Sequence, residues 1–157
     1  MIVVADTSPM LHLSRIGRLE LIPSVLGRVI IPKTVWAELT HPGTDQTVLA
    51  TLEAASWLDR VEDPPPQDLG LDPGETAAIL LAERLKANVL LIDERKGRQV
   101  AITRGLAVLG TLGVVAGARR RGLIPVAAPL IAQLRADGFR LSDALVQDLL
   151  HQLGEAG

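Results

Sequence analysis

Ile2-Val3-Val4-Ala5-Asp6 and Asn88-Val89-Leu90-Leu91-Ile92-Asp93 are the two stretches that decide the fold. Each is a short, continuous apolar run that ends at an aspartate, which is typical of a parallel strand buried on both faces. After the first stretch, Ser8 and Pro9 predict the start of a helix that continues to about Ile16. The chain therefore begins with a strand followed by a helix, and it returns to a buried strand near residue 90.

The rest of the chain continues this alternation of strands and helices. Two more strands are predicted at residues 28–31 and 106–109, and an edge strand at residues 57–61. Between the strands, helices are predicted at residues 33–39, 46–55, 76–85, 96–104 and 111–121. This alternation predicts an α/β protein, a three-layer α/β/α sandwich with a mostly parallel central sheet.

The chain has 157 residues, which fits one compact domain. We expect an α/β domain over residues 1–125 and a C-terminal helical extension over residues 126–157 that packs on the same domain. Helices are predicted in this extension at residues 129–136 and 142–153. The second helix carries an apolar stripe, which we expect to be core or to pack across a dimer: Leu145, Val146, Leu149, Leu150 and Leu153.

Composition excludes several classes of function. The chain has no cysteine, and its three histidines are dispersed, which excludes thiolate zinc sites, iron–sulfur clusters and a paired-histidine metal helix. Aromatic residues make up 2% of the chain, too few for a base-stacking platform. No glycine-rich phosphate loop occurs. The N-terminus has no basic leader, and no apolar run reaches the ~20 residues of a membrane span, so we expect a cytoplasmic protein without a membrane segment.

Charge is unevenly distributed although the net charge is only −2. Residues 38–83 carry ten acidic and one basic residue, whereas residues 84–121 carry nine basic and two acidic residues. The second segment is a candidate nucleic-acid interface, since lysine and arginine hold phosphates. Its candidate residues are Arg95, Lys96, Arg98, Arg119, Arg120 and Arg121. A solvated helix face, with the three consecutive arginines near a helix C-terminus, explains the same pattern and is favoured when charge is taken alone.

Carboxylates are the remaining reactive groups. Asp6 and Asp93 follow buried strands, and the carboxyl ends of parallel strands meet at one edge of a sheet. Glu38 and Glu75 lie on helices from which a long side chain reaches the same edge. Crowded carboxylates repel one another, so they become partly protonated or bind a hard cation such as Mg²⁺ or Mn²⁺. Such a cation activates water for phosphodiester hydrolysis, which favours a nuclease.

Each of these acids also has a structural explanation. Asp6 is placed to cap the first helix, although Ser8 can serve that need. Asp93 can be the N-cap of the helix at residues 96–104, and Glu75 can close a capping box by bonding back to the residue three positions earlier. Glu38 alone would be an ordinary solvent-facing residue. The histidine on the first helix, His12, is expected to be a satisfied helix residue.

Four segments, taken in order, resemble the PIN domain. They are Val4-Ala5-Asp6-Thr7-Ser8-Pro9, Pro32-x-x-Val35-Trp36-x-Glu38-Leu39, Gly74-Glu75-x-Ala77-Ala78-Ile79 and Leu91-Ile92-Asp93-Glu94. The later Gly110-Thr111-Leu112-Gly113-Val114 and Gly122-Leu123-Ile124 resemble a PIN-like family of predicted nucleic-acid-binding proteins, related to the VapC-type ribonucleases of toxin–antitoxin pairs. Many of those toxins have Thr-x-Asp where this chain has Leu91-Ile92-Asp93, and aspartate in place of Glu75.

The resemblance implies that Asp6, Glu38, Glu75 and Asp93 are the metal-binding and catalytic acids of a Mg²⁺- or Mn²⁺-dependent endoribonuclease. It also implies RNA as the substrate, a homodimer, and an antitoxin protein as a partner. The alternative is a non-catalytic module that binds RNA or a protein partner through the basic segment, with the acids serving as helix caps. A shared fold alone does not decide between the two.

Overall fold

Five short apolar runs form the central sheet. The strands are β1 (Val3–Ala5), β2 (Val29–Pro32), β3 (Leu58–Val61), β4 (Val89–Leu91) and β5 (Val108–Leu109). All neighbouring strands are parallel, and their order is β3-β2-β1-β4-β5. The computed structural model describes residues 1–155. It confirms the predicted α/β class and places residues 58–61 at a sheet edge, as expected.

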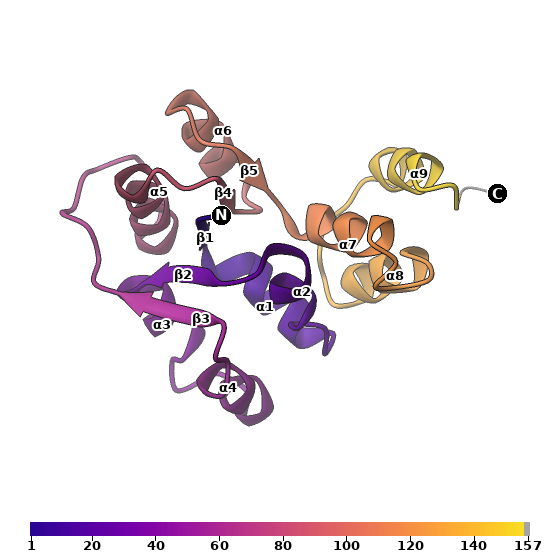
Figure 1. The fold of residues 1–157 in the computed structure, drawn as a ribbon, viewed down its shortest axis with the longest axis horizontal. Helices are drawn as coiled ribbons and strands as arrows, with labels where there is room; N and C mark the ends of the chain where they lie inside the picture. The colour runs from indigo at the N-terminus through magenta and orange to yellow at the C-terminus, as the bar shows by residue number, and fades with distance from the viewer. Residues whose placement is uncertain (156–157) are drawn as a thin grey trace.

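Helices flank this sheet (Figure 1). They are α1 (Thr7–Arg15), α2 (Leu21–Leu26), α3 (Lys33–Leu39), α4 (Gln46–Glu53), α5 (Pro73–Leu85), α6 (Arg95–Thr103), α7 (Thr111–Arg120), α8 (Ala128–Ala136) and α9 (Asp143–Gln152). The sequence did not predict α2, which contains Pro23. That proline is tolerated because it is the third helical residue, where the backbone N–H has no acceptor within the helix.

The core lies where α1 and α5 pack on the sheet. Met10 and Leu13 of α1 and Ile79 of α5 are fully buried, as are all three residues of β1 and the last two of β4, Leu90 and Leu91. Helix α5 packs against β1, β2 and β4. Both central strands are thus covered, which explains why their sequences are continuous apolar runs without alternation.

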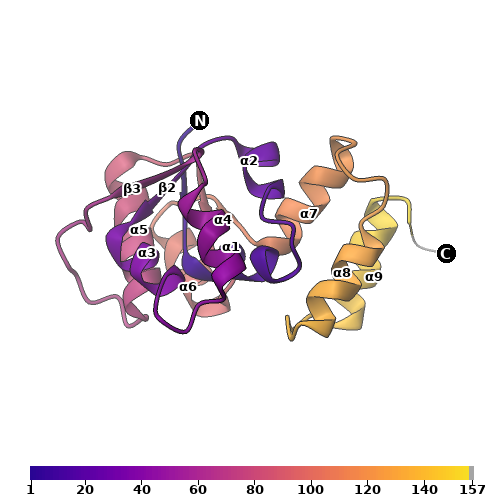
Figure 2. The ribbon, with the colours of Figure 1, turned by 90° about the horizontal axis from the view of Figure 1, so that it is seen from below.

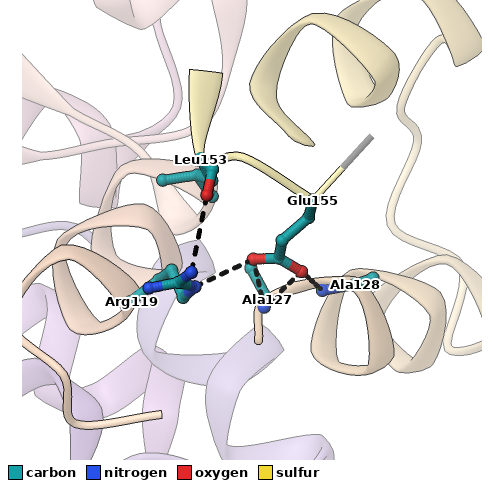
Figure 3. A network of polar contacts seen from close by, with 5 residues as sticks. All are labelled: Arg119, Ala127, Ala128, Leu153 and Glu155. Carbon is teal, nitrogen blue, oxygen red and sulfur yellow. Dashed lines mark hydrogen bonds and ion pairs between the residues drawn. The ribbon is translucent and has the colours of Figure 1, made fainter. Parts of the chain in front are cut away.

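The last two helices lie side by side at one end of the molecule, next to α7 and away from β3 (Figures 1 and 2). Leu134 of α8 is fully buried. The end of the described chain is tied back to α7: Arg119 Nε is 3.2 Å from Glu155 Oε2, and the Glu155 carboxylate also accepts from the backbone N–H groups of Ala127 and Ala128 (Figure 3). Residues 156–157, the end of the predicted extension, lie outside the described residues.

The strand order reverses between β1 and β4. From β1 the chain builds outward to β2 and β3, and from β4 it builds in the other direction to β5. The carboxyl ends of β1 and β4 are therefore neighbours, and the Asp6 N–H donates to the Leu91 carbonyl oxygen at 2.8 Å. In open parallel sheets this reversal is where ligands bind. Among residues 1–155, no helix is both long and apolar enough to cross a membrane.

Candidate active site

Asp6 is a buried carboxylate at the reversal point of the sheet. Its side chain makes no helix-capping hydrogen bond within the described chain, although it occupies the N-cap position of α1. The residue is 3% exposed, and burial raises the pKa of the Asp6 carboxyl to about 7. The negative charges of Asp72, Glu38 and Asp93 raise this pKa further, while the Thr7 backbone N–H opposes the rise. Capping does not explain why an acid is buried here.

The predicted start of the first helix is two residues late. The sequence placed the cap at Ser8, but α1 begins at Thr7 and its N-cap is Asp6. Pro9 is then the third helical residue, where it loses no hydrogen bond. The earlier start brings the Thr7 hydroxyl to the sheet edge, where it donates to Glu38 Oε2 at 2.7 Å.

Glu75 is the second buried acid. Asp72 caps α5, with its Oδ1 accepting from the Glu75 backbone N–H at 2.8 Å, so this half of the expected capping box is present. The Glu75 side chain instead lies against Gly97 of α6, where an added Cβ would collide with Oε2. Within the described residues, that buried oxygen has no hydrogen-bond partner. Burial, followed by the proximity of Asp72, raises the pKa of Glu75 to about 8.

Glu38 reaches from α3 to the same edge. Besides its bond to Thr7, its carboxylate lies against Gly74 at the start of α5, where any Cβ would collide with both of its oxygens. The glycine therefore lets the carboxylate approach the α5 backbone closely. Glu38 is half-buried and contacts α1 and α5, so it is not an ordinary solvent-facing residue.

Asp93 bonds to the start of a different helix from the one that the sequence suggested. Its Oδ1 accepts from the Thr111 backbone N–H at 2.7 Å, and its Oδ2 accepts from the Thr111 hydroxyl at 2.6 Å. Thr111 is the first residue of α7, whereas the predicted alternative was the helix at residues 96–104. That helix, α6, has Glu94 at its N-cap and no side-chain capping bond from the described residues.

His12 lies next to the acids of the site. The sequence analysis predicted an ordinary helix residue whose polar atoms are hydrogen-bonded, and that prediction is wrong. Its Nε2 is 3.9 Å from Asp93 Oδ2, and its ring meets the ring of Phe139 edge-on at 4.5 Å between centroids. Its Nδ1 is buried, without a partner among residues 1–155. Burial lowers the pKa of His12, and the negative charge of Asp93 opposes that change. Phe139 lies more than a hundred residues away, and no local signal pairs the two.

The predicted basic residues divide into two groups. Arg98 lies beside the acidic edge, the edge of the sheet that carries Asp6, Glu38, Glu75 and Asp93. Its Nη1 donates to the Ile92 carbonyl at 3.0 Å. Arg98 Nη1 and Asp93 Oδ1 both lie next to Gly110, where an added Cβ would be 2.9 Å from each of them. On the same helix, α6, Arg95 is exposed and Lys96 donates to the Gly70 carbonyl at 2.9 Å.

The three consecutive arginines lie at the opposite end of α7 from Asp93. Ten residues of helix separate the two ends, or roughly 15 Å. Arg119 is held by Glu155 and the Leu153 carbonyl (Figure 3), while Arg120 and Arg121 are exposed. The structure therefore brings Arg98, but not these arginines, to the acidic edge.

The four predicted acids converge on one region without forming a finished metal site. In the part of the chain that the structure describes, no three carboxylate or histidine side chains are arranged to hold one ion. Glu38 and Asp93 bond to threonines, whereas Asp6 and Glu75 are buried with raised pKa values. Asp72 is a fifth acid whose charge acts on both buried groups, and the sequence treated it only as a cap.

The fold and this edge define a doubly wound α/β protein with a carboxylate-lined site at its strand-order reversal. Comparison with known families identifies it further. The chain belongs to the PIN-domain family: the family model DUF3368, described as a PIN domain, matches residues 2–155. The resemblance to the PIN domain is therefore confirmed. Members of this family are generally nucleases that use divalent metals and bind nucleic acid.

One solved structure supports the fold. It is a PilT N-terminus domain protein from the hyperthermophilic archaeon Sulfolobus solfataricus P2, with 18% sequence identity and a TM-score of 0.54. The match covers 75% of this chain and 93% of that chain. Among curated proteins, none matches this sequence.

Proposed function

We propose that this protein is a Mg²⁺- or Mn²⁺-dependent endoribonuclease that hydrolyses RNA phosphodiesters. The observation that carries the proposal is the pair of buried carboxylates, Asp6 and Glu75, at the reversal point of a parallel sheet. Carboxylates in such a place are costly unless a proton or a cation neutralises them. The family's general activity as metal-using nucleases favours the cation.

The donor set fits a hard divalent cation. It consists of carboxylate oxygens, and one buried oxygen of Glu75 has no hydrogen-bond partner among the described residues. Asp6, Glu38, Glu75 and Asp93 would hold the ion. When bound, the cation supplies charge neutralisation and the activation of water for attack at phosphorus.

The protein's own groups then orient the substrate. Arg98, beside Asp93, is placed to bind a phosphate next to the reacting one. Thr7 and Thr111 fix the orientations of Glu38 and Asp93 through short hydrogen bonds. Gly74 and Gly97 keep the carboxylates close to the backbone because neither position has room for a Cβ.

A second candidate is binding of RNA or a protein partner without cleavage, through the basic segment at residues 84–121. It is favoured by one observation: in residues 1–155 no three acids already form an ion site. The resemblance to toxin ribonucleases adds further proposals. We propose that the protein is a cytoplasmic homodimer, that it has an antitoxin partner, and that its C-terminal extension belongs to the same domain.

Cleavage of labelled RNA separates the two candidates. The wild-type protein is expected to cut internally in Mn²⁺ and not in EDTA, and Asp6→Asn is expected to abolish cutting. Asp148→Asn is the matched control, because Asp148 is exposed on α9 and has no ion-pair partner in the described chain. Cutting by Asp6→Asn at the wild-type rate contradicts the metal-site assignment. RNA binding without cutting by the wild type supports the second candidate.

A further inference from the structure

A cleft lies next to Asp93. It has a volume of about 390 Å³ and is bounded by the β5–α7 segment on one side and the α8–α9 loop on the other. Its lining includes Asp93, Arg98, Phe139, Arg140 and Leu145. The cleft is therefore continuous with the acidic edge and receives one wall from the C-terminal helices.

The lining combines two kinds of chemistry. Leu109, Leu112 and Leu141 provide apolar surface, and Leu145 on α9 is 51% exposed. Arg98 and Arg140 provide positive charge, and Arg140 is exposed without a hydrogen-bond or ion-pair partner within residues 1–155. Apolar surface together with guanidinium groups matches a ligand with a flat apolar part and a phosphate.

The Phe139 ring has a fixed position in this cleft. Its contact with His12 on α1 is edge-on, with 72° between the ring planes, so the α8–α9 loop is anchored to the half of the molecule that carries the acids. The volume suits one small ligand, since sites of this kind occupy about 300–1,000 Å³. A partner helix would need a longer groove.

We propose that this cleft binds one nucleotide of the RNA substrate, the nucleotide adjoining the phosphodiester held at Asp93. Its base packs between Phe139 and the leucines, and its phosphate binds Arg98 and Arg140. The proposal rests on the proposed ribonuclease function and adds a role for the α8–α9 loop and α9, which supply four of the eleven lining residues.

Phe139 gives a direct test because the chain has one phenylalanine and no tyrosine. Protein labelled with ¹³C-phenylalanine and ¹⁵N-tryptophan has a single set of phenylalanine ring signals and one indole N–H signal from each of its two tryptophans. It is titrated with a mixed-sequence RNA hexamer in EDTA. The Phe139 signals are expected to shift in a saturable way, while the indole signal of Trp57, next to the edge strand, stays in place. An RNA complex that leaves the Phe139 ring unchanged overturns the proposal, and so does the absence of RNA binding.

Two variants test the two kinds of lining. Leu145→Trp fills the cleft from an exposed position and is expected to weaken hexamer binding about fivefold or more, the effect of losing one stacked base. Arg140→Glu is expected to lower the slope of log Kd against log salt by about 0.7 for each phosphate that the protein no longer neutralises. The matched controls are Ile102→Trp, at a position 57% exposed on α6, and Arg84→Glu at the far end of α5. If both cleft variants behave as their controls do, the site is wrong.

The result is separable from the nuclease assay. If wild-type protein cuts RNA in Mn²⁺ but the Phe139 ring does not respond, the nucleotide site fails and the ribonuclease stands. If no cutting occurs but the ring responds and the variants weaken binding, the nucleotide site stands and the ribonuclease fails.

Discussion

Replacing Asp6 with asparagine is expected to stabilise the metal-free protein at pH 8. The substitution keeps the shape of the side chain and removes its charge. Burial raises the pKa of Asp6 from 3.8 to about 7, so the folded protein holds a proton that the unfolded chain has already lost between these pH values. The free energy of unfolding of the wild type therefore falls as the pH rises from about 4 to about 7, and the loss is complete above pH 7.

The size of this effect follows from the shift. Each pKa unit corresponds to about 1.4 kcal/mol, so the charged Asp6 lowers the stability at pH 8 by on the order of 4 kcal/mol. This is a large part of the total of about 5–15 kcal/mol for a typical domain. Burying an amide with incomplete hydrogen bonding costs about 1–3 kcal/mol, which still leaves Asp6→Asn more stable than the wild type. At pH 4 that advantage disappears, because Asp6 is then protonated in the folded protein.

Urea denaturation in EDTA at pH 4 and pH 8 measures the difference. Asp148→Asn, the exposed control, is expected to change the stability by less than about 0.5 kcal/mol at either pH. Mn²⁺ at a hundred times its Kd is expected to stabilise the wild type by about 2.7 kcal/mol and to leave Asp6→Asn unchanged. An Asp6→Asn protein that is less stable than the wild type at pH 8 refutes the claim that Asp6 is a buried, uncompensated charge.

Two further substitutions test the surroundings of the site. Arg119→Ala is expected to cost about 1–3 kcal/mol in urea denaturation, because Glu155 loses its ion-pair partner and keeps only backbone N–H donors. The exposed Arg120→Ala is expected to cost less than about 0.5 kcal/mol. Equal effects would show that the Arg119 network does not anchor the C-terminus. Gly97→Ala is expected to destabilise by about 1–3 kcal/mol, since the new Cβ collides with Glu75. A gain of about 1 kcal/mol, the usual helix preference for alanine, would contradict that contact.

The order of elements was predictable because it depends on local patterns. The continuous apolar runs at β1 and β4 identify strands buried on both faces, and the aspartates that follow them mark the strand ends. Parallel topology then requires those ends to meet at one edge. Asp6 and Asp93 could therefore be placed at one edge of the sheet from sequence alone, without knowledge of any distance.

The partners of each acid were not predictable in the same way. Asp93 bonds to Thr111, and the choice between α6 and α7 depends on how β5 directs the chain back to the edge. The contact between His12 and Phe139 forms because the α8–α9 loop returns to α1. The hydrophobic periodicity of the sequence does not predict such a long-range contact. Local rules assigned a cap correctly only where cap and helix adjoin: Asp72 caps α5, although the Glu75 side chain does not bond back to the Asp72 backbone N–H within the described residues.

The acidic edge contains two kinds of carboxylate: two that are hydrogen-bonded to threonines and two that are buried with raised pKa values. This difference determines how the binding of a cation would depend on pH. Glu38 and Asp93 each accept a hydrogen bond from a threonine hydroxyl. Asp6 and Glu75 are buried, and their pKa values of about 7 and about 8 mean that protons stabilise them at neutral pH. A divalent cation must displace those protons, so its apparent affinity rises with pH until both carboxyls are ionised. Burial of Asp6 and Glu75 thus makes cation binding at the proposed metal site depend on pH.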